Sequence, residues 1–275
     1  MGYTQAQIEL TLSKVYLSKD ILEAALLHAL SNEQEEVAGL LLGKWVPLDT
    51  STSSSKAEAS TKFVAIVYKI CALPRADRKK DRVEVSDQDL VKVQQQHQGT
   101  GINVIGWFHS HPHITIKPSH VDLKTQGRFQ QLDSRFFGII ISCFNETSIE
   151  KIAFQSSRTS DLIDIPIIID DKQHLRKFHN NNVNDTRDED GNQHSRMDIL
   201  NVLFEEERDR YKKYLQNSGS NHSHCNRMYI HFTYQQALAK LMEYSLDPNI
   251  RLLQDKLVDK TVQLQMLEKA LLQLK

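Results

Sequence analysis

The chain has 275 residues with 34 basic and 35 acidic side chains, which gives a formal charge of −1. This balance argues against nucleic acid as a direct partner, because nucleic-acid binding depends on clustered positive charge. No stretch approaches the roughly 20 apolar residues of a membrane span, and the first 13 residues lack the apolar core of a signal peptide. Three cysteines at unrelated spacings are typical of buried thiols in a reducing compartment. We therefore expect a cytoplasmic or nuclear protein that does not bind membranes.

Apolar residues at regular spacing predict an α/β domain over residues 1–170. Residues 18–31 have apolar side chains at helical spacing, which predicts a first helix. Apolar runs predict strands at 37–46, 63–73, 103–108, 137–144, 149–154 and 162–169, and two further helices are expected near 87–97 and 119–131. We therefore expect a curved mixed β-sheet flanked by helices.

Three polar segments interrupt this pattern. Residues 49–62 are small and polar, which is typical of a flexible hairpin tip. Residues 75–82 form a basic run that two aspartates interrupt, which favours a solvated loop over an address signal or a binding surface. Residues 171–196 are rich in asparagine and charge and have almost no apolar spacing, so we expect a flexible loop at the end of the domain.

Residues 197–275 are interpreted as a helical region that binds a partner. Helices are predicted at 198–215 and 232–245, and a third follows at 250–274. In the third, alternating steps of three and four connect Ile250, Leu253, Leu257, Lys260, Leu264, Leu267, Leu271 and Leu274, with the lysine as the one exception. This row predicts a coiled coil or a helical bundle; the alternative is a helix that packs back onto its own domain.

A possible second metal site lies between these helices. His222, His224 and Cys225 have a spacing that resembles a set of metal ligands. They lie in a turn-rich linker with no fourth ligand nearby, so a plain loop is favoured.

The strongest functional signal is a cluster of metal-ligand residues after the strand at 103–108. His109 and His111 follow this strand, and at a period of two they project to the same side. Ser119 stands where a helix N-cap is expected, and Asp122 falls in the first helical turn. Three protein ligands and a water are typical of catalytic zinc. The pattern favours a hydrolytic metal site over a pair of exposed histidines and a capping serine.

The sequence His-Ser-His-Pro, followed by Ser119 and Asp122, resembles the JAMM (MPN-plus) motif of zinc metalloproteases that remove ubiquitin or ubiquitin-like proteins. That family has an upstream glutamate in a Glu-Val-x-Gly-Leu setting, which residues 36–40 match with Glu36 as the glutamate. The motif is most similar to the lysine-63-specific catalytic subunit of the BRISC complex and of the Abraxas-containing DNA-damage complex. The resemblance covers roughly residues 15–169 and implies an MPN (JAMM) domain.

The resemblance also implies a role for each residue of the motif. His109, His111 and Asp122 would bind one catalytic zinc ion, with water as its fourth ligand. Glu36 would act as the general base, and the Ser119 hydroxyl would stabilise the oxyanion without acting as a nucleophile. Covalent catalysis has no support, because there is no Gly-x-Ser-x-Gly elbow and the three cysteines, Cys71, Cys143 and Cys225, lie apart from the motif.

The function implied by the resemblance is hydrolysis of isopeptide bonds in lysine-63-linked ubiquitin chains. The implied partners are an MPN-minus subunit of the Abraxas type, bound through the MPN domain and the C-terminal helices, and further scaffold subunits. Two alternatives are a JAMM isopeptidase for another linkage or ubiquitin-like modifier, and a structural MPN scaffold. A barrel amidohydrolase is disfavoured, because its His-x-His lies on its first strand, whereas two predicted strands precede His109 here.

Overall fold

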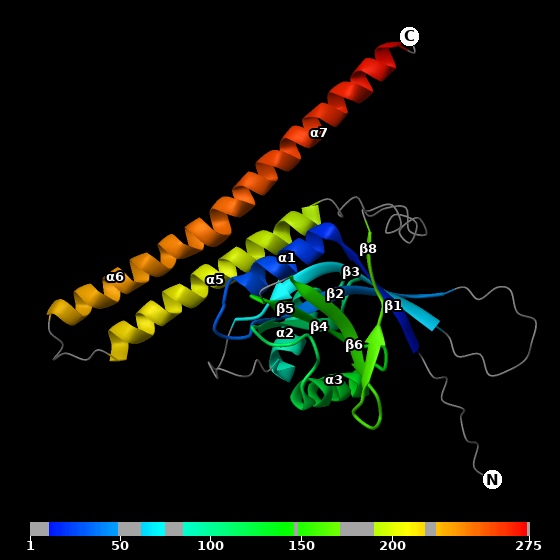
Figure 1. The fold of residues 1–275 in the computed structure, drawn as a ribbon, viewed down its shortest axis with the longest axis horizontal. Coiled ribbons are helices and arrows are strands. Elements are labelled where there is room, and N and C mark those ends of the chain that lie inside the picture. Colours follow the sequence, from blue (N-terminus) through cyan, green and yellow to red (C-terminus); the bar gives the residue numbers. More distant parts are fainter. Residues whose placement is uncertain are drawn as a thin grey trace, which may run out of the picture. The chain divides into compact units, whose positions relative to one another are not determined.

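The computed structural model describes residues 11–48, 62–74, 85–145, 148–170, 190–217 and 224–273. The chain divides into two compact units, Met1–Val202 and Leu203–Lys275, which Figure 1 shows in one ribbon drawing. Within the described ranges no helix is both long and apolar enough to cross a bilayer.

The first unit is built on one mixed sheet of eight strands. Its elements are β1 (Thr11–Ser18), α1 (Lys19–Leu30), β2 (Ala38–Pro47), β3 (Lys62–Ala72), α2 (Asp87–Gln96), β4 (Asn103–Pro112), α3 (His120–Leu132), β5 (Phe137–Cys143), β6 (Glu150–Ser156), β7 (Leu162–Ile165) and β8 (Ile167–Asp170). The strand order is β7-β6-β5-β4-β2-β3-β1-β8. Strand β1 pairs in parallel with β3 and β8, and β4 pairs in parallel with β5.

The sheet is curled so far that its two edges approach each other. The edge strands β7 and β8 are consecutive in the chain and are separated only by Pro166, and β7 also contacts β1 near the opposite edge. The mixed sheet with flanking helices that we predicted is confirmed, and its shape is nearly that of a barrel.

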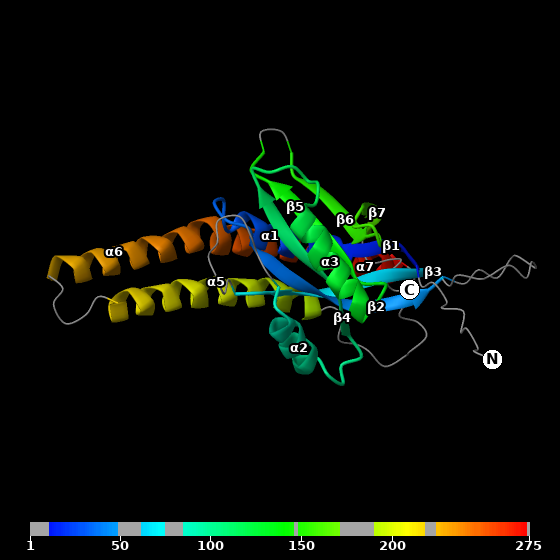
Figure 2. The same cartoon turned by 90° about the horizontal axis from the view of Figure 1, so that it is seen from below.

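Helices cover both faces of the central strand β4. Neighbouring side chains of a strand point to opposite faces, and two successive residues of β4 contact different helices. Trp107 packs with α3 through an edge-on contact with Phe129. The next residue, Phe108, lies on the other face against His28 of α1. Figure 2 shows α1 and α3 on opposite sides of the sheet. The strand is buried from its second residue to its end at Pro112, so the residues after Phe108 enter a protected environment.

Close packing beside β4 requires glycine at one position of β2. A Cβ on Gly39 would lie 2.4 Å from the Phe108 ring and 2.7 Å from the carbonyl oxygen of Cys71. Only a residue without a side chain lets β2 approach both neighbours. This contact keeps the start of β2 next to the end of β4.

The second unit contains the end of α5 (Asp190–Asn217), then α6 (His224–Leu241), a π-helical turn η1 (Met242–Leu246) and α7 (Asp247–Gln273). Tyr211 of α5 stacks on Tyr234 of α6, with ring centroids 4.5 Å apart, and its hydroxyl is hydrogen-bonded to the His231 ring at 3.0 Å. Figure 1 shows α6, η1 and α7 following one another along a single rod.

Apolar side chains of α7 are exposed in two rows. The described members of the predicted row, Ile250, Leu253, Leu257, Leu264, Leu267 and Leu271, are all exposed. A second row consists of Val258, Val262 and Met266, which follow each other at steps of four residues on another face of the helix and are also exposed. Helix α7 therefore has apolar surface on more than one side.

Most predicted helices and strands are present, and most of their ends are shifted by a few residues. The helices α5 and α6 each begin eight residues before the predicted start. Strand β1 was not predicted, and the strand predicted at 162–169 is divided at Pro166. Helix α5 begins at Asp190, so residues 190–196 of the predicted loop 171–196 are helical. The two helices predicted at 232–245 and 250–274 are joined by the π-helical turn η1.

The remaining segment predictions differ or lie outside the described residues. The boundary between the two units falls at Val202, inside α5, and not at the predicted end of the loop. His224 and Cys225 belong to the first turn of α6, so the plain loop predicted there was wrong for these two residues. The predicted loops at 49–61 and 75–82, residues 171–189 and His222 lie outside the described residues.

Candidate metal centre

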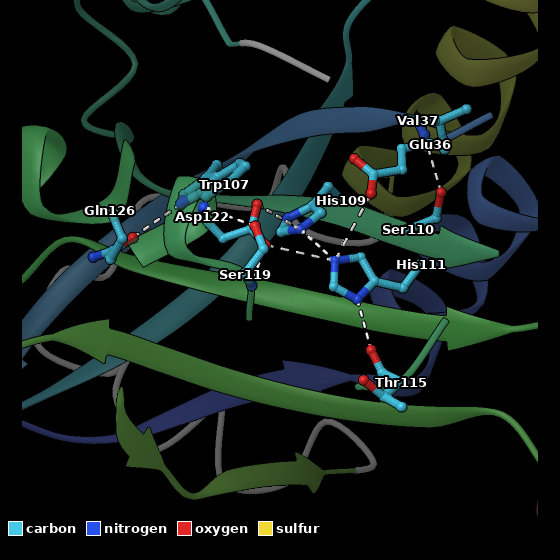
Figure 3. A network of polar contacts seen from close by, with 10 residues as sticks. All are labelled: Glu36, Val37, Trp107, His109, Ser110, His111, Thr115, Ser119, Asp122 and Gln126. Carbon is cyan, nitrogen blue, oxygen red and sulfur yellow. Dashed lines mark hydrogen bonds and ion pairs between the residues drawn. The ribbon is translucent and has the colours of Figure 1, made fainter. Parts of the chain in front are cut away.

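Three potential metal ligands converge where β4 ends and α3 begins. His109 and His111 are only 1% and 3% exposed, and their Nε2 atoms lie 3.1 Å apart. The Asp122 carboxylate places Oδ1 at 3.3 Å from His109 Nε2 and Oδ2 at 3.7 Å from His111 Nε2. One ligand atom from each residue lies within 4.8 Å of the other two. Figure 3 shows the three side chains pointing toward one another.

A backbone carbonyl orients the His111 ring. His111 Nδ1 lies 2.7 Å from the carbonyl oxygen of Thr115, and since a carbonyl can only accept, Nδ1 is the donor. In the neutral ring this leaves the lone pair on Nε2, which faces His109 and Asp122. Burial alone would lower the His111 pKa, but hydrogen bonds to Asp122 and Thr115 raise that pKa above its ordinary value.

Helix α3 orients the carboxylate. Ser119 is the N-cap: its hydroxyl accepts the Asp122 N–H at 3.2 Å, and the Ser119 N–H donates to Asp122 Oδ2 at 2.7 Å. This reciprocal capping box fixes the Asp122 side chain at the first turn of the helix. Burial would raise the pKa of Asp122, but hydrogen bonds from His109 and His111 outweigh it and hold the pKa well below its ordinary value.

Glu36 lies beside the three ligands although it is distant from them in sequence. Its Oε1 is 3.9 Å from His111 Nε2, and its side chain is 12% exposed. It directly precedes Val37 and β2, whose first residue Ala38 pairs with His109 in the antiparallel β2–β4 ladder. The pairing of these two strands therefore brings Glu36 to the histidines.

Two residues that support His109 were not found from the sequence. Trp107 stacks on the His109 ring, with centroids 4.6 Å apart and planes at 12°. The Trp107 indole N–H donates to Gln126 Oε1 at 2.9 Å, and Gln126 in turn donates to the Phe136 carbonyl oxygen at 2.7 Å. Gln126 follows Asp122 by one turn of α3. The signal available in the sequence was the two-residue step from Trp107 to His109, which places both on one face of β4.

The chemistry of the group fits a metal ion. Two imidazole nitrogens and two carboxylate oxygens face one another in a buried space, and acceptor atoms held this closely are stabilised by a shared cation. His109 Nδ1 is buried and has no hydrogen-bond partner within the described part of the chain, so the other ring nitrogen, Nε2, carries the polar contacts of this ring. His109, His111 and Asp122 thus form a site that could hold a metal ion.

Comparisons with known proteins identify both parts of the chain. Residues 10–135 match a family model described as JAB1/Mov34/MPN/PAD-1 ubiquitin protease, and residues 192–274 match one described as the BRCC36 C-terminal helical domain. The Lys-63-specific deubiquitinase BRCC36 of Pongo abelii is 34% identical over 203 residues, which cover 64% of this chain and 79% of the relative. The chain belongs to the JAB/MPN family of ubiquitin proteases. The match of residues 192–274 to the BRCC36 C-terminal helical domain agrees with the predicted resemblance.

Other BRCC36 relatives align over a smaller share of their length. BRCC36 of Mus musculus is 34% identical over 190 residues, which cover 59% of this chain and 65% of the relative. BRCC36 of Xenopus tropicalis is 30% identical over 216 residues, which cover 72% of each chain. The alignment thus spans less than two thirds of the mouse relative. The JAB/MPN match contains all the residues of the candidate metal centre, from Glu36 to Asp122.

Proposed function

We propose that this protein is a zinc-dependent isopeptidase that hydrolyses lysine-63-linked ubiquitin chains. The observation that carries the proposal is the convergence of His109, His111 and Asp122, with Glu36 beside them, in a chain of the JAB/MPN family. The relatives support the choice of substrate, because their names state lysine-63 specificity.

The three ligand residues suit zinc, which is commonly held by imidazole nitrogen and carboxylate oxygen in catalytic sites. When bound, zinc makes water a strong nucleophile near neutral pH and polarises the carbonyl group that is attacked. The chain's contribution is to fix the ligands before binding, through the Thr115 carbonyl for His111 and the capping box for Asp122.

Glu36 is proposed as the general base. Its carboxylate lies at the edge of the ligand group, 3.9 Å from His111 Nε2. In hydrolysis it would accept a proton from the attacking water and later pass that proton to the departing lysine amine. A carboxylate suits both transfers, since it can hold the proton between the two steps.

Ser119 is proposed to stabilise the oxyanion that forms on the isopeptide carbonyl. Its hydroxyl oxygen already accepts the Asp122 N–H, so the hydroxyl hydrogen can be donated to substrate. A fixed donor aimed at developing negative charge typically contributes about a hundredfold or more to the rate.

We further propose that the C-terminal helices bind an MPN-minus subunit of the Abraxas type. Helix α7 exposes two rows of apolar side chains, of which Leu264 and Val262 are examples. A two-stranded coiled coil covers only one such row, whereas a helical bundle covers both. The two rows therefore favour a bundle that contains more than one additional helix.

The test uses the full chain in complex with an Abraxas-type subunit, loaded with zinc, and di-ubiquitin of lysine-63 or lysine-48 linkage. We expect cleavage of the lysine-63 linkage only, its loss on treatment with a chelator and its return when zinc is added. If the zinc-loaded complex cleaves neither dimer nor any ubiquitin-like conjugate, the chain is a structural scaffold and the proposal is wrong. Preferential cleavage of another linkage or modifier would refute the proposed substrate alone.

A further inference from the structure

The serine between the two histidines of the metal centre makes an unusual pair of contacts. Ser110 is fully buried and lies on the opposite face of β4 from His109 and His111. Its hydroxyl oxygen accepts the Val37 N–H at 2.9 Å, and its own N–H donates to the Val37 carbonyl oxygen at 2.9 Å. Both polar backbone groups of Val37 are thus bound by one residue, as Figure 3 shows for the hydroxyl contact.

The hydroxyl takes the place of a main-chain acceptor at the end of the β2–β4 ladder. The last pair in the register is Ala38 with His109, so Val37 lies opposite Ser110. In an antiparallel hydrogen-bonded pair, the two residues normally exchange both N–H···O=C bonds. Here the Val37 N–H binds the side chain of Ser110, so a residue without a hydroxyl cannot make this bond.

Val37 is the point at which the chain leaves the sheet toward Glu36. Strand β2 begins only at Ala38, and residues 31–37 form no helix or strand. The first half of this connection is held by Asn32, whose Oδ1 accepts the N–H groups of Gln34 and Glu35 at 2.9 and 3.1 Å. The two hydrogen bonds between Ser110 and Val37 hold the other end of this connection, one peptide unit from the Glu36 Cα.

We infer that Ser110 is a positioning residue for Glu36, which it holds through the Val37 backbone so that the carboxylate stays beside the metal ligands. The inference rests on the proposed role of Glu36 as general base. Adjacent residues of one strand would then have different roles. His109 and His111 would bind the metal on one face of β4, and Ser110, on the opposite face, would hold the Val37 backbone and thereby Glu36.

The inference predicts a selective loss in Ser110→Ala. Without the hydroxyl, the Val37 N–H loses its partner and the Glu36 segment gains freedom, whereas the ligands on the opposite face of β4 keep their contacts. A misplacement of about 1 Å can cost roughly a hundredfold in rate, so we expect kcat on lysine-63-linked di-ubiquitin to fall by about tenfold to a hundredfold, with little change in KM. The zinc content should remain that of the unaltered protein.

The test is made on the zinc-loaded complex and combines hydrogen exchange at the Val37 amide, zinc content and steady-state kinetics. Ser110→Thr keeps the hydroxyl and should restore both slow exchange and rate. Ser110→Cys has a weaker acceptor and should give an exchange rate and a kcat between those of the serine and alanine proteins. It replaces the alanine variant in the test if that variant folds poorly. Ser156→Ala removes a buried hydroxyl from strand β6, away from Val37, and should leave the exchange and rate unchanged.

A double variant separates positioning from a general loss of structure. If Ser110 acts through Glu36, Ser110→Ala should cause no further loss of kcat in a Glu36→Gln background, because residues that act together are not additive. Unchanged exchange at Val37, loss of zinc in parallel with rate, or additive losses would each overturn the inference. If the unaltered complex hydrolyses nothing, the proposed function is wrong. Hydrogen exchange at the Val37 amide still tests whether Ser110 holds the Val37 backbone.

Discussion

The indole of Trp107 lies nearly parallel to the imidazole of His109, with ring centroids 4.6 Å apart. Metal-bound histidines usually donate their second ring N–H to a carboxylate or carbonyl, which fixes the ring. His109 Nδ1 has no such partner within the described residues. The stacked indole of Trp107, which donates a hydrogen bond to Gln126, therefore orients the His109 ring in place of such a partner.

The first prediction concerns this support. Gln126→Met keeps the volume of the side chain but removes the acceptor for the Trp107 N–H and the donor to Phe136. Loss of such supporting contacts typically lowers metal affinity by about tenfold to a hundredfold, and we expect a zinc affinity reduced on that scale, measured by competition with a chelator. Gln131→Met makes the same change at an exposed position of α3 and should have no effect. Equal affinities in the two variants would contradict this role of Gln126.

A second prediction separates metal ligands from Ser119. His109→Gln should lower the zinc content, whereas Ser119→Ala should keep zinc and lose about a hundredfold in rate, the scale of one oxyanion donor. Metal analysis and kinetics on the same preparations decide between these roles.

The loss of a helix cap needs its own control, because Ser119 also begins α3. Removing an N-cap costs about 1 kcal/mol. Ser86 caps α2 with the same type of capping box, so Ser86→Ala imposes a similar loss without touching the metal centre. Ser86→Ala should retain full activity; if it were as slow as Ser119→Ala, the effect of Ser119 would be structural.

A third prediction concerns assembly through α7. Leu264 and Leu271 are 58% and 63% exposed, so changing both to Asp should leave folding and zinc content unchanged. In a buried helical interface each leucine typically contributes about 2–5 kcal/mol relative to alanine, and the double variant should therefore fail to associate with the Abraxas-type subunit in sedimentation experiments.

The matched control changes Gln263 and Ala270 of the same helix to Asp, which adds the same charge at the same spacing but between the two apolar rows. This control should still associate. An unchanged complex with the leucine variant would mean that the pairing depends on the MPN domain alone.

The parts of the site that the sequence could predict are those defined by local rules. His109 and His111 are two residues apart on one strand, and Ser119 and Asp122 have the spacing of a capping box, so each pair is fixed by the geometry of a single element. Glu36 is far away in the chain and could be assigned only through the family motif.

The parts that could not be predicted depend on tertiary contacts or on irregular backbone. The support of Trp107 by Gln126 and the bond from Val37 to Ser110 join residues 19 and 73 positions apart, and no spacing rule connects them. Strand β1 escaped prediction because a bulge between Leu12 and Lys14 shifts its register and disturbs the alternation of apolar residues. The first turns of α5 are polar and show no apolar face in the sequence.

The most direct test of the central claim is the turnover of lysine-63-linked di-ubiquitin by zinc-loaded Glu36→Gln in the complex. The amide has nearly the same shape as the carboxylate but cannot take up the proton of the attacking water. We predict that this variant binds as much zinc as the unaltered protein and keeps only a residual turnover, lower by about a hundredfold to ten-thousandfold. Turnover equal to that of the unaltered protein, at equal zinc content, would contradict the assignment of Glu36 as the base and with it the proposed mechanism.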